Sequence, residues 1–99
     1  MRPELLTLAA SRMGVDQSPA SIRAKIINDG HTLHESRTGS RKKNEKHAAT
    51  LSKKGPKGGT FVAYDDDPNG ALCVVALRLC DATTQEIHLA WTGEEYKGK

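Results

Sequence analysis

Aromatic residues and long apolar runs are both scarce in this chain of 99 residues. It has one tryptophan, one phenylalanine and two tyrosines, so its core must consist mainly of leucine, isoleucine, valine and alanine. No apolar run approaches the roughly 20 residues of a membrane helix. The first 13 residues also lack the uninterrupted apolar stretch of a secretory signal. We therefore expect one soluble, cytoplasmic domain spanning residues 1–99, with no membrane partner.

The chain has only two cysteines, Cys73 and Cys80, and both lie in the apolar segment 71–80. If that segment is a strand, residues seven positions apart point to opposite faces and are badly placed for a disulfide. Two free thiols are therefore expected. No recognised spacing of metal ligands joins the cysteines to the histidines, so we expect neither a metal site nor a cofactor.

Negative charge is nearly missing from the middle of the chain. Residues 36–58 carry eight cations against the single carboxylate of Glu45, a balance of +7, which leaves −4 for the rest of a chain of net charge +3. Such an asymmetry favours contact with a polyanion, RNA or DNA, over a uniformly basic surface. The candidate nucleic-acid-binding residues are Arg37, Arg41, Lys42, Lys43, Lys46, Lys53, Lys54 and Lys57.

Two helices are predicted in the first thirty residues. In residues 3–14 a proline suits the first turn, the apolar side chains follow a helical stripe and Gly14 can end the helix. Ser18 and Pro19 are a typical N-cap and first position for a second helix, which Gly30 can end. Residues 3–30 are therefore predicted to form the helical part of the domain.

The remaining sequence predicts a long basic loop followed by a sheet. Residues 31–59 are polar and contain glycine, which is typical of a loop. Strands are predicted at 60–64, 71–80 and 87–92, separated by turn-forming residues, and a polar tail follows at 93–99. The expected fold class is α+β, with two N-terminal helices packed on a three-strand antiparallel meander over residues 60–92.

Alternation along these predicted strands places three polar residues on one face of the sheet. Pairing of the apolar faces would bring Arg78 opposite His88, and Tyr64 would join them from the first strand. A histidine can transfer protons near neutral pH, an arginine can bind a phosphate and a tyrosine can stack on a base. Tyr64, Arg78 and His88 are therefore candidate catalytic residues for RNA cleavage without a metal.

Two families resemble parts of this pattern. The order of LLTLAASRMGVDQSPASIRAKIINDG, ALCVVALRLC and IHLAWTG resembles the barnase-like and RelE-like endoribonuclease toxins of bacteria. That resemblance implies RNA cleavage by residues of the sheet face, and an acidic partner of the immunity or antitoxin kind. Residues 8–27 resemble a helix-turn-helix, which implies a DNA-binding regulator of the phage or plasmid type, with Ser18, Ser21, Arg23 and Lys25 opening its recognition helix.

The sequence therefore favours a small nucleic-acid-binding protein and leaves its activity open. One hypothesis is a metal-independent endoribonuclease, and the second is the helix-turn-helix regulator. A third is an accessory protein whose basic segment binds an acidic partner or a ribonucleoprotein. Whether the protein is an enzyme is not decided at this level.

Overall fold

The computed structural model describes residues 3–38, 46–53 and 58–93. Its elements are α1 (Pro3–Met13), α2 (Pro19–Asn28), β1 (Thr32–Thr38), β2 (Lys46–Ser52), β3 (Thr60–Asp65), α3 (Pro68–Leu79) and α4 (Thr84–Thr92). The fold class is α+β, as predicted, and the two N-terminal helices pack on the same side of the sheet as α3. None of the described helices is long and apolar enough to cross a membrane.

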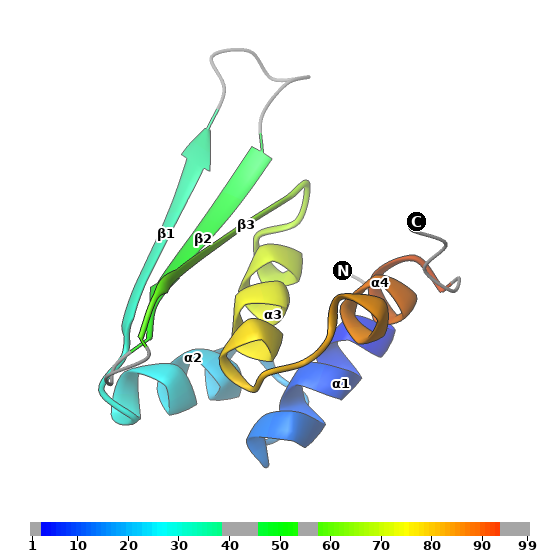
Figure 1. The fold of residues 1–99 in the computed structure, drawn as a ribbon, viewed down its shortest axis with the longest axis horizontal. Coiled ribbons are helices and arrows are strands. Elements are labelled where there is room, and N and C mark those ends of the chain that lie inside the picture. Colours follow the sequence, from blue (N-terminus) through cyan, green and yellow to red (C-terminus); the bar gives the residue numbers. More distant parts are fainter. Residues whose placement is uncertain (1–2, 39–45, 54–57, 94–99) are drawn as a thin grey trace.

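The sheet is an antiparallel meander of three strands in the order β1-β2-β3. Its register pairs Leu33 with Leu51 and Leu51 with Phe61, so these three side chains form one row on one face. Figure 1 shows α3 against the sheet, with α1 and α4 beyond α3. Thus β1 and β3 are the edge strands, and the helices lie on only one side of the sheet.

The helix α3 is the centre of the core. Asp67 caps its first turn by accepting a hydrogen bond from the Asn69 N–H, and Pro68 takes the first helical position. β2 and β3 pack on one side of α3, while α1 and α2 pack on others. Its fully buried side chains are therefore distributed around its circumference: Ala71, Leu72, Cys73, Val75, Ala76 and Leu77. An apolar run of this kind is typical of any element covered on all sides, whether strand or helix.

The positions of the strands differ from the prediction. Segments 71–80 and 87–92, predicted as strands, lie in α3 and α4. Residues 31–59, predicted as a basic loop, contain β1 and β2, so the meander runs over residues 32–65 and not 60–92. Of the predicted strands only 60–64 is correct, as part of β3. The helical part at 3–30 is confirmed, and the predicted tail lies outside the described residues after Gly93.

The two cysteines are free, as expected, but the geometry is different from the one predicted. On a helix, residues seven positions apart lie on nearly the same side and are separated by roughly 10 Å along the axis. Cys73 and Cys80 are thus kept apart by distance along α3 and not by opposite faces of a strand. Burial raises the pKa of the Cys73 thiol to about 11.

The junction between β3 and α3 depends on one glycine. Asp65 is 5% exposed, and its carboxylate accepts a hydrogen bond from the Asp66 N–H at 2.9 Å. A β-carbon at Gly70 would overlap this carboxylate. Gly70 therefore allows α3 to begin immediately beside the end of β3, which seats the helix on the sheet.

We expect Gly70→Ala to lower the free energy of unfolding by about 1–3 kcal/mol, because the buried Asp65 carboxylate must move. Urea denaturation followed by circular dichroism measures the loss. Gly59→Ala is the control, since a β-carbon there meets nothing within 4 Å. Asp65→Ala combined with Gly70→Ala should be less destabilising than the sum of the two single changes. Additive effects would show that the overlap is not the cause.

Candidate functional site

The two faces of the sheet have different environments. One face, called the covered face, packs on the helices and includes Ala49, Leu51 and Ala63, all buried. The other, called the open face, comprises the alternate residues Thr32, His34, Ser36, Lys46, Ala48, Thr50, Ser52, Thr60, Val62 and Tyr64. Tyr64 is 59% exposed and Val62 49% exposed, which is unusual for large apolar side chains.

The strands contribute no carboxylate to the open face among its ten residues. Their acidic residues, Glu35 and Asp65, are on the covered face by register. Glu35 there accepts two hydrogen bonds from Arg23 of α2, at 2.8 and 3.0 Å. The open face is therefore a polar surface, rich in threonine and serine, that would not repel an anion.

The chain segments that continue the strands at both ends of the sheet carry cations in their sequence. The chain between β1 and β2 joins one end and carries Arg41, Lys42 and Lys43 in its sequence, while the chain between β2 and β3 joins the other. The predicted residues Arg41, Lys42, Lys43, Lys54 and Lys57 lie outside the described residues. Of the remaining three, Arg37 is exposed on β1 beside the first of these connections.

Two of the candidate lysines contact carboxylates. The Nζ atom of Lys46 lies 2.9 Å from Asp66, which follows β3 at the corner of the open face. The Nζ atom of Lys53 lies 3.4 Å from Asp81. The carboxylates of both pairs are strongly exposed, so each pair is worth about 1 kcal/mol at most and is readily exchanged for another anion.

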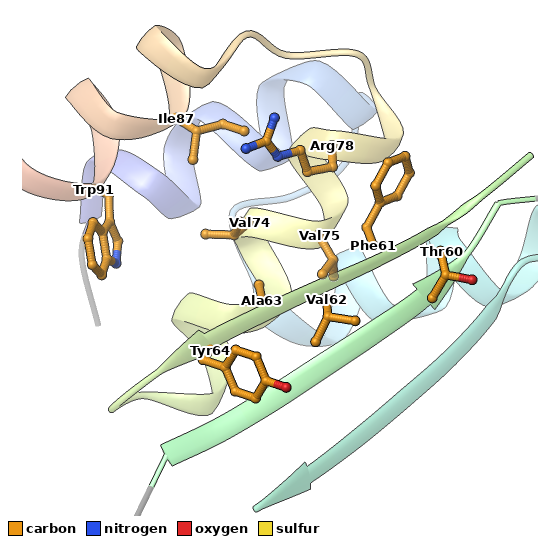
Figure 2. Close-up of a pocket in the computed structure, with 10 residues that line it drawn as sticks. All are labelled: Thr60, Phe61, Val62, Ala63, Tyr64, Val74, Val75, Arg78, Ile87 and Trp91. Atoms are coloured by element: carbon orange, nitrogen blue, oxygen red, sulfur yellow. The ribbon is translucent and has the colours of Figure 1, made fainter. Parts of the chain in front are cut away.

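A groove runs along the free edge of β3. Its cavity volume is about 380 Å³, and its lining residues come from β3, α3 and α4: Thr60, Phe61, Val62, Ala63, Tyr64, Val74, Val75, Arg78, Ile87 and Trp91. Figure 2 shows Phe61 and Arg78 at one end of the groove and Tyr64 at the other. Three of the four aromatic residues of the chain line this groove.

Arg78 is the only charged residue among the described residues that line the groove. Its guanidinium donates a long hydrogen bond of 3.4 Å to the hydroxyl of Thr84, which is a neutral acceptor. The remaining wall is largely apolar, with valines of α3 facing the edge strand. The groove therefore combines apolar walls with one cation that no lining carboxylate neutralises.

The predicted catalytic trio is only partly brought together. Tyr64 and Arg78 line the same groove, but Arg78 projects from α3 and not from a strand. His88 lies on α4 and is not among the residues lining the groove. The predicted single sheet face for all three was wrong, because two of the residues are on helices. The segments ALCVVALRLC and IHLAWTG, which resembled paired strands of endoribonucleases, lie in the helices α3 and α4.

The predicted recognition helix uses its cations internally. Arg23 of α2 binds Glu35 and also donates to the Asn69 side chain at 3.0 Å, which joins α2 to β1 and α3. Lys25 lies 3.4 Å from Asp29 within the same helix. Arg23 is thus a structural link between three elements, and contact with DNA would require breaking it.

The sequence analysis missed Phe61, Trp91 and the valines as neighbours in a groove. Their contact depends on 71–80 being a helix, and one signal for it was present. Asp67-Pro68, like Ser18-Pro19, places a typical N-cap residue before a proline at the first helical position, and in the structure only Asp67 of the two cap residues accepts a side-chain capping hydrogen bond. Within residues 3–38, 46–53 and 58–93, no three His, Cys, Asp or Glu side chains gather as a metal site would require.

The position of α4, and of Trp91 with it, depends on Glu86. The Thr83 and Glu86 side chains each accept a hydrogen bond from the other's backbone N–H, forming a capping box. Glu86 also lies 2.6 Å from Arg12 of α1. The Thr83 N–H, together with the Arg12 guanidinium, holds the pKa of the Glu86 carboxyl below its usual range.

Glu86 should make stability depend on pH at the acid end. Because its pKa is lowered by folding, its stabilisation is complete above the unfolded pKa, about 4.3, and is lost as pH falls through the folded value. We expect Glu86→Gln to be less stable than the wild type at pH 7, and the difference to shrink as the pH falls below the unfolded pKa of Glu. Urea midpoints across this range measure the difference. A constant difference would mean that Glu86 acts without its charge.

The charge of the groove can be measured through Trp91, which is the only tryptophan. We expect the ratio of iodide to caesium quenching to be about twofold higher for Trp91 than for free N-acetyltryptophanamide at equal ionic strength, because Arg78 attracts anions. Arg78→Gln should bring this ratio close to that of the free amide. Lys25→Gln, which removes a charge outside the groove, should not. Preferential quenching by caesium would contradict the positive potential assigned to the groove.

Comparison of the chain with protein-family models, curated proteins and solved structures found no match.

Proposed function

We propose that this protein binds nucleic acid by laying the phosphate backbone across the open face of its sheet, with RNA as the first candidate. The observation that carries the proposal is the distribution of charge about the sheet. The strands put no carboxylate on the open face, and cationic connections join both of its ends. Threonine, serine and histidine side chains between them can donate hydrogen bonds to phosphate oxygens.

The dimensions of the face suit several phosphates. The seven residues of β2 extend over about 20 Å. A single strand of a duplex places about six phosphates along this length of helix axis. Cations at both ends of the face would therefore hold the two ends of such a segment. Affinity from these contacts depends on salt and little on base sequence.

Cleavage of the bound RNA is not part of this proposal. The acid–base role was assigned to His88. No histidine is among the described residues that line the groove, whose two ends hold Tyr64 and Arg78. The helix-turn-helix alternative would need Arg23, which binds Glu35 and Asn69. Binding across the sheet requires neither residue. Incubating labelled RNA in EDTA and examining its length after binding tests separately for a nuclease.

Carboxylates added to the open face should weaken binding. We expect Thr50→Glu and His34→Glu, which are cross-strand neighbours, each to weaken binding of labelled single-stranded RNA and duplex DNA by about tenfold at 50 mM salt. Ser11→Glu, on the exposed surface of α1, is the control and should have little effect. Fluorescence anisotropy measures the affinities. Equal effects of all three variants would show that only net charge matters and would overturn the assignment to this face.

Releasing the two paired lysines should strengthen binding. We expect Asp66→Asn and Asp81→Asn to remove one carboxylate contact from Lys46 and from Lys53, respectively, so that each lysine is more available to phosphate. Each should steepen the dependence of log affinity on log salt by about 0.7 to 0.9. Asp81 has a positive φ of 61°, a conformation that asparagine tolerates well, so the fold should survive. Asp16→Asn, on an exposed residue that lines neither the open face nor the groove, is the control for net charge. An equal gain from it would contradict the proposal.

A further inference from the structure

The hydrogen-bonding direction of β3 can be read from its hairpin with β2. The Lys53 N–H donates to the Gly59 carbonyl at 2.8 Å, and these residues are opposite each other in the register that pairs Ser52 with Thr60. Hydrogen-bonded pairs alternate along an antiparallel ladder. Phe61 and Ala63 therefore direct their backbone N–H and C=O groups to β2. Val62 and Tyr64 direct theirs away from the sheet, toward the groove.

This edge lacks the features that normally protect an edge strand. Natural edges are shielded by charged side chains, proline, bulges or a covering element. β1, the other edge, has Glu35, Arg37 and His34 along it. β3 has the sequence TFVAYD, with no proline or lysine and with its one acidic side chain buried. The two edges of one small sheet thus differ sharply, and only the β3 edge is bordered by the groove.

The groove has the shape that an added strand requires. Five consecutive residues of β3, Thr60 to Tyr64, line it, so the groove follows the strand edge and is not a pocket at one point. The facing wall consists of Val74, Val75, Ile87 and Trp91. Alternate side chains of an extended peptide paired with β3 would enter the space beside this wall, and the others would extend the open face. Figure 2 shows this wall opposite the edge strand.

We propose that the free edge of β3 binds an extended peptide of a partner protein that carries an acidic side chain, which adds a fourth strand to the sheet. The Val62 and Tyr64 backbone groups bind the peptide main chain, and the apolar wall holds its alternate side chains. Arg78, which donates a hydrogen bond to the neutral Thr84 hydroxyl, pairs with the peptide carboxylate. This site adjoins the open face along β3, because Thr60, Val62 and Tyr64 belong to both, but it uses the backbone edge of the strand and the apolar wall.

A peptide fits this edge better than the other occupants. Main-chain groups of β3 repeat every two residues, about 6.8 Å, and only another extended peptide matches that repeat along five residues. A second copy of β3 would offer Asp65 as its acidic residue, but that side chain is buried beside Gly70. It therefore provides no carboxylate for Arg78. A nucleic-acid base could stack on the aromatic side chains but would use only one segment of the edge.

The test begins by selecting binders from a displayed library of random ten-residue peptides on the intact protein. We expect enriched peptides to have β-branched or aromatic residues at alternate positions and one Asp or Glu. With an enriched peptide at ten times its Kd, hydrogen exchange at the Val62 and Tyr64 amides should slow about tenfold. The amides of Phe61 and Ala63, already bonded to β2, should change little. No enrichment, or uniform protection of all four amides, would overturn the proposal.

Variants of the peptide avoid any doubt about folding of the protein. Methylating the alternate peptide nitrogens that face β3 should abolish binding, while methylating the others should not. Val62→Pro is the matching change in the protein and should also abolish peptide binding. The N–H that it removes points to the groove and makes no hydrogen bond to β2. Replacing the peptide's Glu by Gln should weaken binding about fivefold, and this difference should vanish in Arg78→Gln but remain in Lys25→Gln.

Three results would overturn the proposal. Two of them would assign the edge to another occupant, and the third would place the peptide elsewhere. Alternating protection that rises with protein concentration alone, together with dimers in sedimentation, would assign it to a second copy. The same alternating protection caused by a single-stranded oligonucleotide would assign it to nucleic acid. Equal sensitivity of the peptide affinity to Thr50→Glu and to Arg78→Gln would place the peptide on the open face. Loss of nucleic-acid binding in Thr50→Glu with retained peptide binding would leave both proposals standing.

Discussion

Burial of α3 is the constraint on which the rest of the fold depends. This helix has apolar side chains on nearly all sides, and each side requires a cover. The sheet provides one cover through β2 and β3, and α1 and α2 provide others. Among residues 3–38, 46–53 and 58–93, no further element lies on the second side of the sheet. The open face is thus a consequence of covering α3 with a small number of elements.

The groove also results from the way α3 is covered. α4 packs on α1 and is fixed there by Arg12 and by its capping box, so it does not lie against β3. The β3 edge therefore faces Val74 and Trp91 across an open space and not a packed helix. Two chemically different surfaces meet along β3. Its outward side chains belong to the polar open face, and its backbone edge belongs to an apolar groove with one arginine.

Several acidic residues have structural roles away from the open face. Asp67 and Glu86 satisfy N–H groups at the starts of α3 and α4, where the helix dipole also favours negative charge. Glu35 binds Arg23 on the covered side. Asp66, which follows β3, contacts Lys46 at the corner of the open face. The strand residues of the open face are therefore left without a carboxylate of their own.

Part of this arrangement followed from local sequence and part did not. Ser18 and Pro19 correctly located the start of α2, because a proline at the first helical position is a local signal, although the Ser18 side chain makes no capping hydrogen bond. The same signals at Asp67-Pro68 and at Thr83–Glu86 were outweighed by the apolar run 71–80, which is compatible with a buried strand or a buried helix. The strands β1 and β2 were missed because their open-face residues are polar, and the polar sequence 31–59 is equally typical of a loop. Tyr64 and Arg78 were predicted to be neighbours on a sheet, but they line one groove because Arg78 is on the helix α3 beside β3.

The sequence by itself determined the α+β class, the two N-terminal helices and the concentration of positive charge in residues 36–58. These properties depend on composition, on the spacing of a few residues and on capping chemistry, all of which act over short distances along the chain. Only the tertiary structure decided which apolar segment is the central helix, which face of the sheet stays open and which strand edge borders a groove. Those outcomes depend on how segments far apart in sequence cover one another's apolar surface. Because the hydrophobic effect is not directional, no single segment shows which other segments will cover it.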